Sequence, residues 1–387
     1  MDRPQKGPRR IGRGGILLPF KLLGIPVRLD VSFLLVLPLL AYLIGSQLPE
    51  FNAQLRELAR AMDPDLARRL DPGPAVGAPA WLLGLVAALG LFASVVLHEL
   101  GHAVTARLYG VQTLEIRLWF LGGVAQFKDL PRRRGAEAIV AVAGPVTSVV
   151  LALLLWALLP RVELGATAST IVAYLAATNA MLAVFNLLPA IPLDGGRVLR
   201  SLLALLMPRL RATQVAVAVS AGIAAVLGFY GVVSGQLFLI VLAFFVYEAG
   251  RSEAQAAALE HALAGQTAED LMTPAPQAVD PDMTLGQFVR LRHYGRHAGY
   301  PVTDSAGRLL GFAFIADALA ALDEQPEDAT VRTVLRDADV IRPGASGVEV
   351  LTALANSELG RLCVTDPTGR LVGIVGKTDV IAALRRG

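Results

Sequence analysis

Long apolar runs dominate the first 250 residues of this chain. A membrane-spanning α-helix needs about 20 consecutive apolar residues, because lipid offers no partner to backbone polar groups. Only 17% of the residues are charged, against about 25% in a typical soluble domain. We therefore predict a polytopic α-helical membrane protein. Its six expected spans, of which the first and last are short, are 31–44, 81–109, 137–159, 168–188, 213–233 and 236–247.

The composition changes after Gly250, and the remaining residues have ordinary soluble character. This shift predicts a membrane domain over residues 1–250, a linker over 251–265 and a soluble α/β region over 266–387. An even number of spans would leave both ends of the chain on the same side of the bilayer.

Arginine and lysine gather in the N-terminal tail and in the segments after the second and fourth spans. Basic segments of this kind usually face the cytoplasm. We therefore expect a multi-pass protein of the cell membrane, with the N-terminus, the soluble region and the mouth of the site described below in the cytoplasm. The bilayer is itself an expected partner, whereas nucleic acid is not, because no basic patch interleaved with aromatic residues is present.

The second span contains HELGH, which places His98, Glu99 and His102 within five positions of an apolar helix. Ionisable side chains at membrane depth cost roughly 2.5 to 3.5 kcal/mol each on insertion scales, so something must offset them. A bound metal ion does so. His98 and His102 are at positions i and i+4, share one helical face and can converge on one zinc ion. Glu99 is placed to accept a proton from the attacking water.

A third zinc ligand is expected, because catalytic zinc sites usually have three protein ligands. Cys363 is the only cysteine, which excludes a cysteine cage. The stretch NLLPAIPLDGGR follows the fourth span, where Pro189 and Pro192 should end the helix. The second and fourth spans both run inward in the expected topology, so Asp194 should lie at the depth of HELGH.

Three motifs together resemble the site-2 protease family of intramembrane zinc metalloproteases: HELGH, AGPVTS in the third span and NLLPAIPLDGG after the fourth. The resemblance implies an endopeptidase that cuts membrane-anchored proteins, such as anti-sigma factors or membrane-bound regulators, within or beside a spanning helix. It also implies one Zn²⁺ per chain, held by His98, His102 and Asp194, with Glu99 as general base. Asn186 would lie near the substrate or the developing oxyanion, although an amide in a membrane helix often serves only helix packing.

Residues 111–129 are too short and too interrupted to form a span. Alternating residues on either side of Gly122 and Gly123 predict a β-hairpin that dips into the cytoplasmic half of the membrane. In the family that the chain resembles, such a strand pairs with an unwound substrate, which makes these glycines candidate substrate-binding residues. A purely structural hairpin that walls off the zinc fits the sequence equally well. Gly144, Pro145 and Ser148 of AGPVTS are expected to permit close helix packing rather than to perform chemistry.

The soluble region contains two similar units with a period of about sixty residues, at about 266–325 and 326–387. Both resemble the CBS module, which usually works as a pair and binds adenine nucleotides. Asp317 and Asp379 match the ribose-binding acid of that family. The position three residues earlier, commonly Ser or Thr, is Phe314 in one unit and Gly376 in the other. We therefore expect weak or absent nucleotide binding, and a structural or homodimer-forming pair remains an open alternative.

Two other functions would leave different marks in the sequence. A CBS-regulated channel or transporter would carry polar residues through several spans, or inverted repeats with broken helices. Here the intramembrane polar residues concentrate in one constellation with metal-ligand spacing. A catalytically inactive scaffold would have lost Glu99 or a ligand, and none is missing. The sequence therefore favours the protease.

Overall fold

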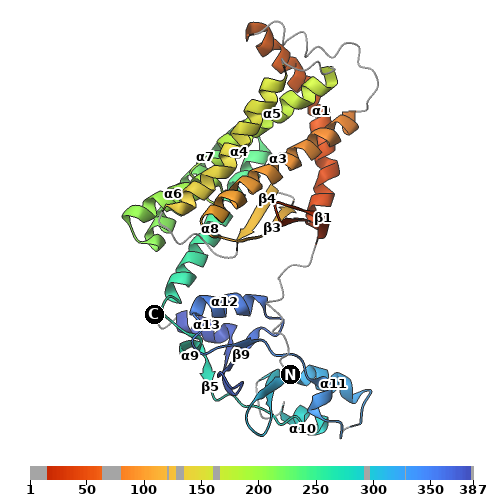
Figure 1. The fold of residues 1–387 in the computed structure, drawn as a ribbon, viewed down its shortest axis with the longest axis vertical. Helices are drawn as coiled ribbons and strands as arrows, with labels where there is room; N and C mark the ends of the chain where they lie inside the picture. The colour runs from red at the N-terminus through yellow and green to blue at the C-terminus, as the bar shows by residue number, and fades with distance from the viewer. Residues whose placement is uncertain are drawn as a thin grey trace. The chain divides into compact units, whose positions relative to one another are not determined.

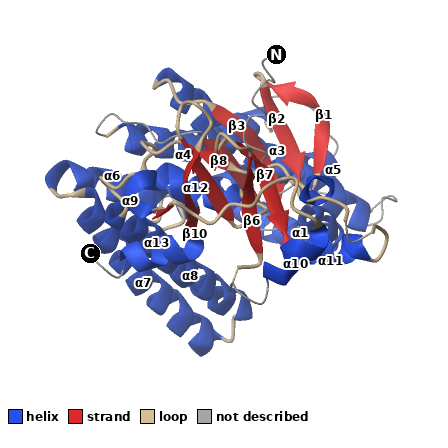
Figure 2. Ribbon diagram, turned by 90° about the horizontal axis from the view of Figure 1, so that it is seen from below, coloured by secondary structure: helices blue, strands red, loops and turns tan. Residues whose placement is uncertain are grey.

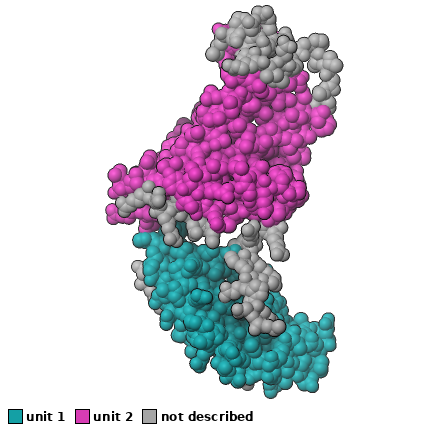
Figure 3. All heavy atoms as spheres, in the orientation of Figure 1, with its two compact units in different colours: residues 1–13, 256–387 teal, residues 14–255 magenta. Residues whose placement is uncertain are grey.

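The computed structural model describes residues 15–62, 80–119, 122–127, 135–159, 166–291, 297–326 and 328–384. The chain divides into two compact units at residue 256 (Figure 3). We call residues 14–255 the membrane unit and residues 256–387 the C-terminal unit.

Seven described helices begin in the membrane unit: α1 (Val31–Met62), α3 (Ala80–Leu108), α4 (Ala136–Leu158), α5 (Ala166–Asn186), α6 (Asp194–Leu206), α7 (Arg209–Ser234) and α8 (Leu237–Ala262), which ends in the C-terminal unit. Within the described part of the chain, α1, α3, α4, α5 and α7 are long and apolar enough to cross a membrane. The polytopic α-helical fold is thus confirmed. The sixth predicted span forms only the beginning of α8, because Glu248, Arg251 and Glu253 interrupt its apolar character after eleven residues.

The helices of the membrane unit pack as a chain of neighbours, α1 on α3, α3 on α4 and α4 on α5, with α6 between α4 and α7 (Figure 1). Small residues allow the closest approach. A Cβ atom added to Gly84 of α3 would lie only 1.8 Å from the carbonyl oxygen of Ala41 in α1. Without a hydrophobic driving force between helices in lipid, such close van der Waals packing is the main source of association.

A four-stranded sheet lies beside α3. Its order is β1 (Ile16–Leu22), β2 (Ile25–Leu29), β3 (Thr113–Trp119) and β4 (Gly122–Phe127), and the first three strands lie side by side in Figure 2. β3 and β4 pair antiparallel, as the hairpin prediction requires, whereas β2 and β3 pair parallel. Ile25, Ala103 and Ile116 join the sheet to α3 in one apolar cluster. β4 is left as the edge strand nearest the HELGH sequence.

The C-terminal unit contains two copies of a helix, two strands and a second helix, as predicted. The first copy comprises α10 (Leu285–Arg290), β6 (Gly299–Thr303), β7 (Leu309–Phe314) and α11 (Ile315–Leu322). The second comprises α12 (Gly347–Asn356), β9 (Arg361–Thr365), β10 (Leu371–Gly376) and α13 (Lys377–Leu384), and the remaining elements are α9 (Ala268–Leu271), β5 (Thr273–Pro274), η2 (Val331–Val334) and β8 (Val340–Ile341). Capping boxes at Thr267, Thr284 and Ser346 fix the starts of α9, α10 and α12.

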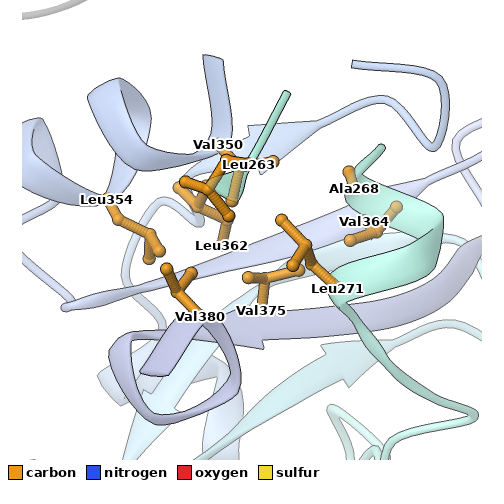
Figure 4. Packing of buried hydrophobic residues seen from close by; sticks show 9 residues of the cluster. All are labelled: Leu263, Ala268, Leu271, Val350, Leu354, Leu362, Val364, Val375 and Val380. Carbon is orange, nitrogen blue, oxygen red and sulfur yellow. The ribbon is translucent and has the colours of Figure 1, made fainter. Parts of the chain in front are cut away.

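Each copy has its own apolar core, and each core includes a segment from outside that copy. Leu263, Ala268 and Leu271 precede the first copy in sequence but pack with Val350 and Leu362 of the second (Figure 4). In the same way, Val331 of η2 packs into the core of the first copy. The two copies therefore exchange their leading segments, which makes the pair one folding unit.

Candidate active site

Helix α3 brings the HELGH side chains together. His98 and His102 are buried, at 3% and 4% exposure, and Glu99 is half-buried. The one-turn spacing of the histidines places both rings on the same face of α3. One potential ligand atom from each of His98, Glu99 and His102 lies within 4.8 Å of the others.

Asp194 reaches the two histidines from the first turn of α6. The chain turns sharply between the end of α5 at Asn186 and the start of α6 at Asp194. Gly195 permits this turn, because a Cβ atom there would lie 2.2 Å from the carbonyl oxygen of Leu187. As a result, Asp194 Oδ2 lies 3.2 Å from Nε2 of His98 and 3.2 Å from Nε2 of His102.

The three atoms form a triangle that fits a zinc ion. The two Nε2 atoms are also 3.2 Å apart, so all three sides are equal. Two ligands of a tetrahedral zinc ion, each at about 2.0 to 2.1 Å, lie about 3.3 Å from one another. Two imidazoles and one carboxylate also match the donor set of catalytic zinc sites, which leave a fourth position for water or substrate. These residues therefore fit Zn²⁺ in both spacing and chemistry.

Helix α4 holds both imidazole rings in the orientation that a metal requires. His102 Nδ1 donates to the carbonyl oxygen of Val140 at 2.7 Å, so the lone pair of the neutral ring lies on Nε2, where it can bind a cation. His98 Nδ1 lies 2.9 Å from Ser148 Oγ. Gly144 makes room for the rings, because a Cβ atom there would lie 2.2 Å from His102 Nε2.

Ser148 and Val140 are functional partners that sequence reasoning did not identify as such. AGPVTS was expected to permit helix packing, and Gly144 does so, but Ser148 also bonds a ring of the site. The signal was present in the spacing, since Ser148 lies one turn after Gly144 on the same helical face. The Val140 carbonyl carries no sequence signal, because every residue has one.

The edge strand β4 lies directly against Glu99. The backbone N–H of Ala125 donates to Glu99 Oε2 at 2.9 Å. Gly123 is in close contact with the same side chain, because a Cβ atom there would lie 2.8 Å from Glu99 Cγ. Neighbouring residues of an antiparallel strand point their N–H groups in opposite directions. Gly123 and Ala125 therefore face the open edge, whereas Val124 and Gln126 face β3.

Asn186 and Gly122 are the remaining predicted site residues of the membrane unit. Asn186 ends α5, and its Nδ2 donates to the carbonyl oxygen of Leu182 one turn earlier, so its substrate role stays a prediction. Gly122 begins β4 with a φ of 137°, a conformation that favours glycine.

Asp317 and Asp379 of the C-terminal unit are both already engaged. Arg336 Nε and Nη2 donate to the two oxygens of Asp317, each at 2.6 Å. Asp379 accepts from the backbone N–H of Gly376 at 2.7 Å and from Thr273 Oγ1 at 3.1 Å.

An HExxH-type group on a long apolar helix, with a carboxylate at ligand distance, defines the class of protein: a zinc metalloprotease with multiple membrane helices. Comparison with known proteins agrees with this class. The model of peptidase family M50 matches residues 86–165 and 161–229, and the CBS domain model matches residues 268–324 and 327–386.

Relatives extend the match over nearly the whole chain. A zinc metalloprotease of Methanocaldococcus jannaschii is 29% identical over 365 residues, which is 94% of this chain and 95% of that protein. Rip3 of Mycobacterium tuberculosis is 31% identical over 331 residues, covering 80% of this chain and 83% of its own length. The solved site-2 protease from Methanocaldococcus jannaschii aligns at 30% identity and a TM-score of 0.42, over 62% of this chain and 95% of its own. This chain belongs to peptidase family M50, the site-2 protease family, and carries tandem CBS domains.

Proposed function

We propose that this protein is a zinc-dependent intramembrane endopeptidase that cleaves membrane-anchored proteins within or beside a spanning helix. The observation that carries this proposal is the 3.2 Å triangle of His98, His102 and Asp194 atoms, built on helices of a membrane domain. Zinc held by these three residues would act as a Lewis acid that polarises the scissile carbonyl. Cleavage by such a centre releases the soluble part of a substrate, as in regulated intramembrane proteolysis.

Glu99 is the proposed general base. Its Oε2 is held by Ala125, which fixes the carboxylate and leaves Oε1 to accept the proton of the attacking water. The proton then passes from Glu99 to the leaving amine as the peptide bond breaks. Asn186 remains a candidate donor to the developing oxyanion, since its amide nitrogen has a second hydrogen beyond the one bonded to Leu182.

The open edge of β4 is the proposed docking site for the substrate. A peptide bond within a helix is shielded by its own side chains, so the substrate has to unwind before attack. An extended segment added to β4 would pair with the N–H and carbonyl of Gly123 and would lie beside Glu99, which already accepts from the N–H of Ala125. Gly123 is therefore assigned to substrate binding, and Gly122 remains a predicted substrate-binding residue.

The orientation and the partners follow from charge and chemistry. We infer that the N-terminus, the C-terminal unit and the mouth of the site face the cytoplasm of a cell membrane. The substrates would be single-span proteins, such as anti-sigma factors or membrane-bound regulators. The CBS pair would modulate cleavage or form a homodimer rather than sense adenine nucleotides.

Comparative membrane proteomics of cells with the wild-type protein and with Glu99→Gln tests this proposal. Single-span proteins that are cut near their membrane segment should accumulate in full length only in the variant. If the two membrane proteomes contain the same full-length single-span proteins, the protein does not cleave that substrate class.

A further inference from the structure

Arg200 is a buried charge that the mechanism above does not use. It lies on α6 at 6% exposure, and its guanidinium bridges two carboxylates from other helices. Nη2 donates to Glu137 of α4, and Nη1 donates to Glu253 of α8. Burial alone would lower the pKa of Arg200, but the two glutamates outweigh it and raise the pKa. A buried charge of this kind is stable only while its partners remain in place.

Two of the bridged helices build the zinc site. Helix α6 begins at Asp194, six residues before Arg200. Helix α4 contains Glu137 in its first turn, and three residues later it presents the Val140 carbonyl that orients His102. A second tie lies beside the first, because the backbone N–H of Ala138 donates to Ser201 Oγ at 3.2 Å. The position of α6 on α4 therefore sets where Asp194 lies relative to the imidazole rings.

The third helix leads out of the membrane unit. α8 runs without interruption from Leu237 to Ala262, and Leu263 directly after it is buried in the core of the second CBS copy. Leu259 on the last turns of α8 packs against the same core. Glu253 precedes Leu263 by ten residues, or about 15 Å of helix. A change in the CBS pair that rotates or shifts the end of α8 will therefore also move Glu253.

The two glutamates that bind Arg200 differ in their exposure to solvent. The side chain of Glu137 is 17% exposed, whereas that of Glu253 is 41% exposed. A cavity of about 270 Å³ borders both glutamates, Arg200 and His102. Glu253 can therefore leave Arg200 for water at a lower cost than Glu137, and the cavity provides space for the movement.

We propose that Arg200 is a positioning residue for Asp194, and that Glu253 makes this positioning depend on the CBS pair through α8. This inference rests on the zinc ligands proposed above. When Glu253 is in place, Arg200 holds α6 on α4 and Asp194 stays at ligand distance from both histidines. When α8 shifts, Arg200 keeps only Glu137, α6 loosens and the third ligand is lost more often.

The rate at which a chelator removes zinc from the purified full chain tests the first half, because it needs no substrate. Arg200→Gln should release zinc about 10- to 100-fold faster than the wild type, as expected for loss of a supporting group. The matched control is Arg209→Gln, an exposed arginine at the start of α7, which should release zinc at the wild-type rate. Arg200→Lys keeps the charge but not the fork that reaches both carboxylates, and should fall between them.

Glu253→Gln should also accelerate zinc release, by less than Arg200→Gln, because Glu137 remains. Glu248→Gln removes the same charge from a half-buried position of the same helix that pairs with Arg251 instead of Arg200, and should have no effect. Circular dichroism and size-exclusion chromatography would check that each variant is folded.

A double-mutant cycle tests the link to the CBS pair. Leu263→Ala disturbs the core that α8 enters, whereas Leu285→Ala disturbs the core of the first copy, and both residues are fully buried. Leu263→Ala should accelerate zinc release in the wild-type background but add nothing in the Glu253→Gln background. Leu285→Ala should leave the release rate unchanged in both backgrounds.

The outcomes separate this inference from the proposed function. Wild-type zinc release in Arg200→Gln and Arg200→Lys would overturn the positioning role while the protease proposal stands. Additive effects of Leu263→Ala and Glu253→Gln would overturn the route through α8. A wild-type protein that binds no zinc would overturn the proposed function itself.

Discussion

Buried polar and charged side chains gather in the membrane unit, where they include His98, His102, Asp194 and Arg200. Among the described residues of the C-terminal unit, Thr365 alone is of this kind. Large apolar side chains show the reverse pattern. Many are exposed on the membrane unit, while the exposed ones described in the C-terminal unit are Leu310, Leu319, Val340, Val348 and Ile381.

The contrast shows that burial has a different meaning in each solvent. Helices in lipid gain no hydrophobic free energy by burying leucine. The interior of the helix bundle is therefore available for polar groups that must avoid hydrocarbon. A soluble unit has to bury apolar side chains in its interior, and its acidic side chains stay near the surface. The burial of Asp194 therefore indicates a functional role. The hydrogen bonds of Asp317 and Asp379 indicate instead that these two acids are already engaged by their own chain.

The largest expected effect comes from the chemistry of the membrane unit. Glu99→Gln should reduce cleavage by about 10²- to 10⁴-fold, because the amide cannot accept the proton. Its zinc content should stay near normal, whereas Asp194→Ala should lose both zinc and activity. Metal analysis and a cleavage assay on the purified variants measure this. Full zinc and continued cleavage in Asp194→Ala would show that the site is wrongly assigned.

The next effect concerns the edge strand beside Glu99. Ala125→Pro removes the N–H that holds Oε2, and the displaced carboxylate should lower cleavage by about 10²-fold. Ala125→Gly keeps the N–H and is the control. Proline at Val124 or Gln126 tests something else, because those N–H groups face β3 and their loss would break the hairpin. Equal cleavage by Ala125→Pro and Ala125→Gly would rule out this backbone contact as a positioning group.

In the C-terminal unit, Arg336 should compete with any nucleotide for Asp317. We expect weak or absent ATP and AMP binding by the wild-type protein, and a gain in affinity of at most about fivefold for Arg336→Ala, because an exposed ion pair competes only weakly for the carboxylate. Calorimetry on the full chain measures both values. Arg332→Ala, which removes an exposed arginine paired with Asp282, is the control. Low-micromolar binding by the wild type that Asp317→Ala abolishes would restore a nucleotide-sensing role.

A separate prediction concerns Cys363 and tests whether the C-terminal core is closed. Burial raises the pKa of this thiol to about 12, with a further contribution from Asp339. Only the thiolate reacts, so at pH 8 alkylation of the folded protein should be at least about a hundredfold slower than that of a free thiol. Mass spectrometry after iodoacetamide treatment follows the reaction, with denatured protein as the reference. Labelling of the folded protein at the denatured rate would show that the core opens readily.

Much of the architecture was predictable from the sequence, because the periodicity and length of apolar runs are local properties that indicate helices and strands. The long apolar runs predicted the membrane helices, the alternation around Gly122 and Gly123 predicted the hairpin, and the repeated motif predicted the CBS pair. Two spans were exceptions: the first, predicted to end at residue 44, is the start of α1, which continues to Met62, and the sixth is the start of α8. Its apolar run is continued by a charged helical segment, and a helix can extend well beyond the residues that lipid requires.

The sequence by itself determined which residue types are available for zinc, because the spacing of His98 and His102 on one helix is a local property. It also pointed to Asp194 through topology alone. Only the tertiary structure decided which groups support them: the Val140 carbonyl, Ser148, the Ala125 N–H and the bridge from Arg200 to Glu137 and Glu253. These partners are separated by tens of residues, or are backbone groups that every residue possesses. Their proximity depends on how the helices and the sheet pack, and no local pattern encodes that packing.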